Sequence, residues 1–121
     1  MTQPIPVQIV PVPQFLGEHG DQYAFAYTIH ITNRSEQTIT LRNRHWIITH
    51  GDGSLEEVIG EGVVGETPQL KPGASYSYTS GAVIPTRVGS MKGSYGFVTG
   101  DGRSFRAEIP EFALHTPDSL H

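Results

Sequence analysis

The fold is decided by the stretch Arg44-His45-Trp46-Ile47-Ile48-Thr49, which holds the only tryptophan of the chain. A large ring within a run of β-branched residues is typical of a core strand in a β-sandwich. The chain then turns at Gly51-Asp52-Gly53 and continues into the partly apolar run Leu55-Glu56-Glu57-Val58-Ile59. We therefore expect Trp46 to be buried between two sheets, with a short strand after the turn.

Upstream of this stretch, residues 23–32 alternate between large apolar side chains and small or polar ones. A period of two places every second side chain on the same face of a strand. This segment is the clearest strand of the chain, and its large side chains are predicted to join Trp46 in the core. They are Tyr23, Phe25, Tyr27, Ile29 and Ile31.

The alternation changes parity just before Trp46. Ile39 and Leu41 are odd-numbered, whereas Trp46 and Ile48 are even-numbered. One extra residue in a strand moves every later side chain to the opposite face. We therefore predict a β-bulge within residues 42–45, which would place both pairs in the core.

Other regions also have strand character. Residues 5–11 alternate weakly and contain prolines, which lack a ladder donor and confine such a segment to a sheet edge. A short strand is predicted at residues 76–79. The runs 91–98 and 105–109 are joined by the hairpin signal Gly100-Asp101-Gly102 and should pair antiparallel.

The last part of the chain is expected to leave the sheet. Pro110 should end the final strand, Phe112 and Leu114 should pack back onto the core, and residues 115–121 should form a loose tail. About seven short strands then follow one another at spacings of roughly 8–12 residues. This pattern predicts an all-β fold, an antiparallel sandwich of two sheets.

Composition agrees with this prediction and narrows the classes of partner. The chain has 121 residues, 14 glycines, 9 prolines and only 17% charged residues, which favours one β-rich domain spanning residues 1–121. The net charge of −4, with Lys71 and Lys92 as the only lysines, argues against binding to nucleic acid or to an anionic membrane. No apolar run approaches the ~20 residues of a membrane span.

The amino terminus and the cysteine content suggest a compartment. Four prolines within the first 13 residues, and no lysine or arginine, argue against a signal peptide. With no cysteine there is no disulfide and no thiolate ligand, so a cytoplasmic location is the simplest expectation.

A series of ordered motifs resembles the ApaG family of bacterial proteins, also called CorD, and runs through nearly the whole chain. The motifs are Tyr23-x-Phe25-Ala26-Tyr27-x-Ile29-x-Ile31-x-Asn33, Arg44-His45-Trp46-x-Ile48, Val58-x-Gly60-x-Gly62-Val63-Val64-Gly65-Glu66-x-Pro68-x-Leu70-x-Pro72-Gly73, Tyr78-x-Ser80-Gly81, Gly89-x-Met91-x-Gly93-x-Tyr95 and Ile109-Pro110-x-Phe112-x-Leu114.

This resemblance implies a sandwich like those of immunoglobulin and fibronectin type III domains. It associates the chain with cobalt and magnesium handling, and such proteins are often encoded beside a dinucleoside-polyphosphate hydrolase. Similar domains in eukaryotic F-box proteins and in a polymerase-interacting protein look like protein-recognition modules. The resemblance therefore implies a partner protein more directly than it implies a reaction.

The motif Gly60-x-Gly62-x-x-Gly65 raises the alternative of a nucleotide site. A dinucleotide fingerprint needs a helix after the glycines, but Pro68 and Pro72 follow too closely for one. We therefore expect the glycines to serve turns and close packing. If the loop binds an anion, Gly60, Gly62 and Gly65 would supply backbone amides and Arg42 or Arg44 a guanidinium. Otherwise, we expect Arg42 and Arg44 to cap backbone carbonyls or to pair with Glu56 or Glu57.

The remaining polar residues do not suggest catalysis. His45 and His50 are not expected to share a strand face, so the sequence predicts no metal site, and no motif indicates a cofactor. The chain has no Gly-x-Ser-x-Gly elbow. We expect a non-enzymatic binding module for a partner protein, with weak binding of pyrophosphate or a dinucleoside polyphosphate by the Gly60–Gly65 loop as the alternative.

Overall fold

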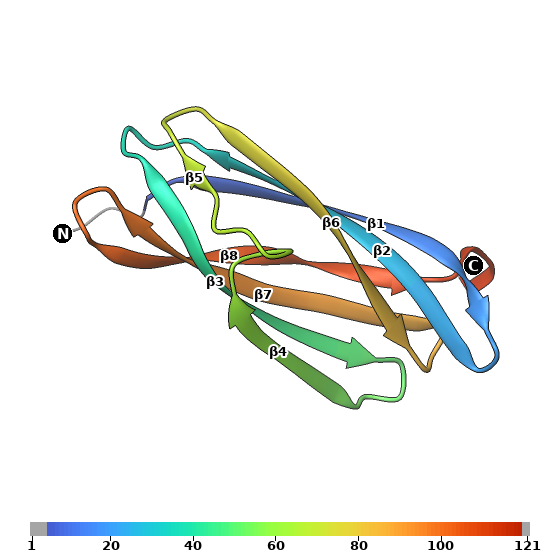
Figure 1. Ribbon diagram of the computed structural model, residues 1–121. Helices are drawn as coiled ribbons and strands as arrows, with labels where there is room; N and C mark the ends of the chain where they lie inside the picture. Colours follow the sequence, from blue (N-terminus) through green and yellow to red (C-terminus); the bar gives the residue numbers. More distant parts are fainter. Residues whose placement is uncertain (1–4, 120–121) are drawn as a thin grey trace.

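The computed structural model describes residues 5–119 and contains two antiparallel sheets packed face to face (Figure 1). This confirms the predicted all-β sandwich, and no α-helix occurs within the described residues. The strands number eight rather than about seven, because a two-residue strand, β5, was not expected. They are β1 (Val7–His19), β2 (Gln22–Asn33), β3 (Ile39–His50), β4 (Leu55–Glu61), β5 (Gln69–Leu70), β6 (Ser75–Ile84), β7 (Val88–Thr99) and β8 (Ser104–His115).

The smaller sheet has the order β1-β2-β6. All five large residues predicted from the alternation of β2 are buried, so this strand behaves as expected. β1 is an edge strand, also as expected, but it continues to His19 instead of ending near Pro11. Pro11 and Pro13 pair with β2 without breaking the strand, because one side of an edge strand needs no ladder donor.

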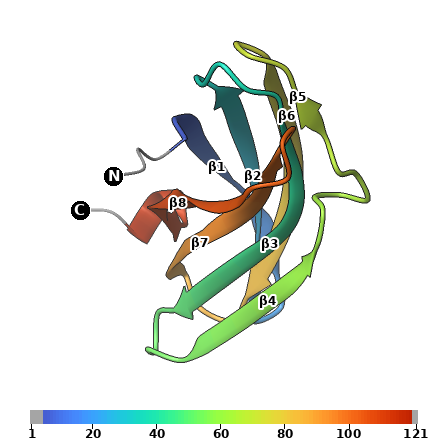
Figure 2. The same cartoon turned by 90° about the vertical axis from the view of Figure 1, so that its left-hand side faces the viewer.

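The larger sheet has the order β4-β3-β7-β8, with β5 paired to the start of β3. Figure 2 shows β4 at one margin of this sheet. The predicted bulge is present, because the register of β3 against β7 shifts between Leu41 and Asn43. Arg42 is the extra residue, and Leu41 and Trp46 are therefore both buried.

The end of the chain differs from the prediction. β8 runs through Pro110 to His115, and its register against β7 shifts at Pro110, which an edge strand with a bulge accommodates. Thr116 is buried, its N–H donates to the carbonyl of Arg87 at 3.1 Å, and Pro117–Ser119 form a 3-10 turn. The expectation of a loose tail is therefore wrong for residues 115–119, while residues 120–121 lie outside the described residues.

Trp46 occupies the centre of the core, as predicted. It is 2% exposed and makes edge-to-face contacts with Tyr27, Tyr95 and Phe112, with ring centroids at 5.4, 6.2 and 5.9 Å. Such ring pairs contribute roughly 0.5–1.5 kcal/mol each beyond the burial of area. Tyr27 belongs to the smaller sheet, so these rings join the two layers.

One polar contact also crosses between the layers. The hydroxyl of Tyr78 on β6 hydrogen-bonds the hydroxyl of Tyr95 on β7. Burial raises the pKa of both phenols above the ordinary value of 10.0. Both phenols therefore stay neutral in the folded protein, and each hydroxyl has the other as its hydrogen-bond partner inside the core.

Across residues 5–119, the structure has no helix with the length and apolar character needed to cross a membrane.

Candidate functional site

The glycine loop, residues 60–66, begins at the end of β4 and contains a tight hairpin turn. Val63 and Glu66 exchange two backbone hydrogen bonds of 2.8 and 2.9 Å around the central residues Val64 and Gly65. Both central residues have positive φ, 43° and 80°, as in the two-residue turns that suit β-hairpins. Gly62 also has positive φ, and a Cβ there would meet the carbonyl oxygen of Glu66 at 2.3 Å. The loop is thus built by its own backbone contacts.

Several loop amides are already occupied by these contacts. The N–H of Gly62 donates to the carbonyl of Arg42 at 2.9 Å, and that of Val63 donates to Glu66. An anion-binding nest needs amides that converge on the ligand. The loop conformation therefore gives a structural reason for Gly62 and Gly65 that does not depend on a ligand.

Arg44 reinforces the same loop. Its Nη1 donates to the carbonyls of Glu61 at 2.8 Å and Gly62 at 3.0 Å. A Cβ on Gly60 would lie 2.7 to 2.8 Å from the guanidinium, so the missing side chain makes room for it. The structure thus brings Arg44, Gly60 and Gly62 together, as capping of carbonyls predicts.

Arg42 lies elsewhere. Its side chain is exposed at the bulge and lines a different hollow, of about 210 Å³, which it shares with Asn43 and Arg106. A larger adjoining hollow, of about 460 Å³, is lined by Asn43, His45, Ile59 and Arg106 among others. Both hollows include residues on the outer face of the larger sheet, the face turned away from the smaller sheet.

A third cleft opens between the two sheets. It has a volume of about 250 Å³ and lies between β4 and β6, with Tyr27 and Trp46 in its walls. Glu56 and Val58 of β4 line this cleft, whereas Leu55 and Ile59 lie on the opposite, outer face of the strand. Leu55 and Ile59 are 68% and 71% exposed, although both are large and apolar.

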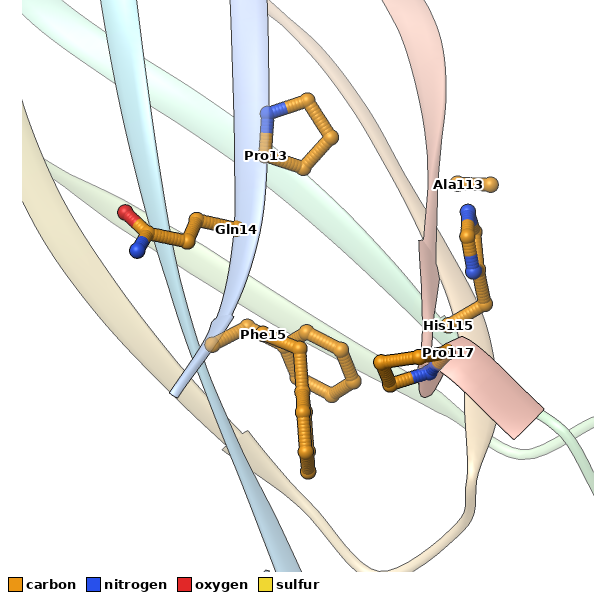
Figure 3. A pocket seen from close by; sticks show the side chains of 7 residues that line it. Pro13, Gln14, Phe15, Ala113, His115 and Pro117 are labelled. Atoms are coloured by element: carbon orange, nitrogen blue, oxygen red, sulfur yellow. The ribbon is translucent and has the colours of Figure 1, made fainter. Parts of the chain in front are cut away.

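A fourth hollow, of about 210 Å³, lies between β1 and β8 (Figure 3). Pro13 and Phe15 face Ala113, His115 and Pro117 across it. Its lining is mainly apolar, and His115 is the only titratable side chain in it. The residues that line this hollow therefore do not include an acid–base pair.

The hairpin between β3 and β4 has the residue types of a catalytic triad but not its proton arrangement. Nδ1 of His50 lies 3.0 Å from the hydroxyl oxygen of Ser54, and Nε2 lies 3.3 Å from a carboxylate oxygen of Glu56. The Ser54 hydroxyl itself donates to Asp52 at 2.6 Å, a bond that holds the pKa of that carboxyl below its usual range. The serine proton is thus directed to Asp52, whereas the serine of a catalytic triad directs it to the histidine that acts as general base.

His45 is paired separately with Glu57, at 2.7 Å. Because residue parity puts His45 and His50 on opposite faces of β3, the two histidines do not meet. No group of three or more histidine, aspartate or glutamate side chains within residues 5–119 is placed to hold a metal ion.

Sequence reasoning missed the arrangement around Arg106. This residue lies on the outward face of β8, and its guanidinium donates hydrogen bonds to Asn43 on β3 and Ser94 on β7. The alternation of Phe105, Ala107 and Ile109 indicates that Arg106 points outward. Its partners, however, depend on the β3–β7–β8 register, which the sequence alone does not specify.

Comparison with known proteins agrees with the fold. The family model described as the ApaG domain matches residues 14–99 of this chain. The chain is 50% identical over 119 residues to Protein ApaG of Dechloromonas aromatica, covering 95% of this chain and 94% of that one. It is 52% identical over 110 residues to Protein ApaG of Pseudomonas paraeruginosa, with 91% and 87% covered.

A solved structure is similar over the whole length. The crystal structure of a Bordetella pertussis protein that carries the name ApaA superposes with a TM-score of 0.90 at 40% identity, and the match covers 98% of this chain and 100% of that one. Sequence and structure thus agree across both sheets and the glycine loop. The chain belongs to the ApaG family.

Proposed function

We propose that this ApaG-family chain is a non-enzymatic module that recognises a partner protein through the exposed edge of β4. The observation that carries this proposal is the 68% and 71% exposure of Leu55 and Ile59 on a strand that pairs on one side only. An unpaired strand edge offers N–H and C=O groups to an incoming strand, and neighbouring apolar side chains add contact area.

The other sheet edges are less open to strand addition. β1 carries Pro11 and Pro13, and β8 carries Pro110. Prolines on an edge remove donors and protect it from pairing. β6 has no proline, but Val83, at 59%, is its only large apolar residue that is exposed. β4 also has no proline, and it exposes two large apolar side chains, Leu55 and Ile59, on one face.

This module would work in the cytoplasm, where a chain with no cysteine meets no disulfide requirement. Any link to cobalt or magnesium would then pass through the partner protein. Binding of pyrophosphate by Gly60, Gly62 and Gly65 remains an alternative, but the internal bonds of Gly62 and Val63 do not favour it.

Site-specific photo-crosslinking tests the role of β4. A photoreactive amino acid replaces Ile59 in one protein and Val12 in a control. Val12 is also apolar and 48% exposed, but it lies on the proline-protected edge of β1. We expect a discrete crosslinked partner in cells from position 59 and none from position 12, and we expect Leu55→Lys to remove it. Equal crosslinking from both positions, or none from position 59, would contradict the proposal.

A separate assay tests the absence of catalysis. The purified protein is incubated with dinucleoside polyphosphates and divalent ions, and the products are separated. We expect no turnover above the rate without protein. Turnover that disappears in Arg44→Ala or in His45→Ala would show that the module is an enzyme.

A further inference from the structure

We propose that the outer face of the larger sheet carries a binding site for a small oxyanion, built around the guanidinium of Arg106 with Arg42 beside it. This site adjoins the glycine loop, because Gly60 and Glu61 line a hollow together with Arg106, but it uses guanidinium groups and not the loop amides. It does not depend on recognition of a partner by β4. Its ligand class is a phosphate or carboxylate group, because these oxygens match the geometry of a guanidinium fork.

Arg106 is held in place by neutral partners. Its Nε donates to the Ser94 hydroxyl at 3.0 Å, and its Nη1 donates to Oδ1 of Asn43 at 3.0 Å. These partners lie on β7 and β3, so three strands fix one side chain. A guanidinium has five N–H donors, and these two bonds leave three of them for a ligand.

A glycine makes this arrangement possible. Asn43, Gly96 and Arg106 are neighbours in one row across β3, β7 and β8. A Cβ on Gly96 would lie 2.4 Å from Oδ1 of Asn43. Only glycine lets the Asn43 side chain lie across β7 and reach Arg106. Gly96 is therefore part of the structure that orients the guanidinium.

The charge of Arg106 is not neutralised by an ion pair. No carboxylate lies within 4.0 Å of its guanidinium among residues 5–119, where the ion pairs are those of His45, His50 and Arg87. Its two partners are an amide and a hydroxyl. A fixed positive charge with neutral partners is suited to an anionic ligand.

The β-bulge supplies the second cation. Arg42 is the extra residue of the bulge and is exposed, and no hydrogen bond or ion pair of its side chain occurs in the described part of the chain. It lines the same hollow of about 210 Å³ as Arg106, Asn43 and Ser104. Two arginine residues and a serine thus line one concave surface.

Nearby acids limit the affinity. Glu61 lines the adjoining hollow, and Glu108 is two residues from Arg106 on the same face of β8. With a net charge of −4, the protein should bind a small oxyanion weakly and with strong dependence on salt. A compact anion avoids these carboxylates better than an extended polyphosphate does.

An NMR titration with inorganic phosphate tests the site. The protein is labelled with nitrogen-15, ionic strength is held constant with sodium chloride, and both backbone amides and arginine Nε–H signals are followed. We expect saturable shifts at Arg106 Nε–H and at the amides of Asn43 and Gly96. A parallel titration with acetate identifies the preferred oxyanion, and saturation with either anion at these signals supports the site.

Matched variants identify the groups responsible. Arg106→Gln should weaken binding by about tenfold or more, as expected for loss of a charge-assisted contact. Arg42→Gln should weaken it severalfold without affecting folding, because this side chain makes no bond in the described structure. Arg34→Gln is the charge-matched control; Arg34 directly follows β2 of the smaller sheet and bonds Gln8, and this variant should bind like the parent protein.

Three outcomes would overturn the proposal. The first is the absence of saturable shifts with both anions. The second is a set of shifts confined to residues 60–66, which would return the anion to the glycine loop. The third is equal binding by the Arg106→Gln, Arg34→Gln and parent proteins. None of these results bears on crosslinking from β4, so the two proposals fail independently.

Discussion

Val64 is a β-branched residue with positive φ, 43°, in the hairpin turn of the glycine loop. This backbone region crowds a branched side chain, whereas asparagine and glycine adopt it readily. Val64 is also 54% exposed, so little packing offsets the strain. We expect Val64→Asn to raise the free energy of unfolding by about 0.5–1 kcal/mol, measured by urea denaturation.

The control for this prediction is Val83→Asn. Val83 is similarly exposed, at 59%, but it lies within strand β6, where β-branched residues are favoured. This substitution should leave stability unchanged or lower it. A loss of stability in Val64→Asn would mean that the apolar contacts of Val64 outweigh its backbone strain.

The buried tyrosine pair makes stability depend on alkaline pH. The folded pKa of Tyr78 and of Tyr95 is raised by burial, while the unfolded chain ionises near 10.0. Stability from this difference is fully present below pH 10 and is lost as the pH rises above it. We therefore expect the free energy of unfolding to fall from about pH 10 upward, and to fall less steeply in Tyr95→Phe.

Tyr95→Phe should also cost about 1–3 kcal/mol at neutral pH, because it leaves the buried Tyr78 hydroxyl without its partner. The double variant Tyr78→Phe/Tyr95→Phe should be more stable than the sum of the single changes predicts, since it removes both polar groups. Strictly additive losses would show that the hydroxyls do not depend on each other.

At the scale of strands, Gly93 allows β3 and β7 to lie close together. A Cβ at this position would meet the carbonyl oxygen of His45 at 2.0 Å and Cα of Trp46 at 3.1 Å. Both contacts are with backbone, which cannot move aside cheaply. We expect Gly93→Ala to lower the free energy of unfolding by about 3 kcal/mol or more, measured by chemical denaturation.

Gly17→Ala is the matched control for Gly93→Ala. No atom lies within 4 Å of a Cβ at position 17, and its φ is not in the left-handed region. It should keep the parent stability within about 0.5 kcal/mol. Similar losses in both variants would point to a general intolerance of alanine in strands, and not to the close approach at Gly93.

Strand patterns were predictable where a single face is buried. The alternation of β2 and the parity change before Trp46 specified a core face and a bulge, because a one-residue shift would expose every large side chain. The extent of β1 and β8 was not predictable in this way. Pro11 and Pro110 were read as limits, but edge strands need fewer ladder donors and continue through them.

The candidate sites depend on contacts between strands, which the sequence does not contain directly. Capping of carbonyls by Arg44 could be expected, because a glycine loop follows β4 nearby. The contact between Arg106 and Asn43 spans 63 residues and passes across Gly96. It can be found only when the register of β3, β7 and β8 is known.

At the scale of the molecule, the two sides of the sandwich differ. On one side, β1 and β8 approach each other, with the apolar hollow around Phe15 between them (Figure 3). On the other side, a cleft opens between β4 and β6, and Ile59 is exposed on the outer face of β4. This asymmetry places the edge strand β4 beside the cleft that has Tyr27 and Trp46 in its walls.

The rings around Trp46 come from both sheets, so the two layers should unfold together. Trp46 is the only tryptophan, and its fluorescence reports directly on the contact with Tyr27 across the sandwich. We expect one urea transition, with the same midpoint by Trp46 fluorescence and by far-ultraviolet circular dichroism, as for a single cooperative domain. Trp46→Phe, followed by circular dichroism, should keep one transition at a lower midpoint. Separate midpoints for the two probes in the parent protein would show that the sheets unfold as independent units.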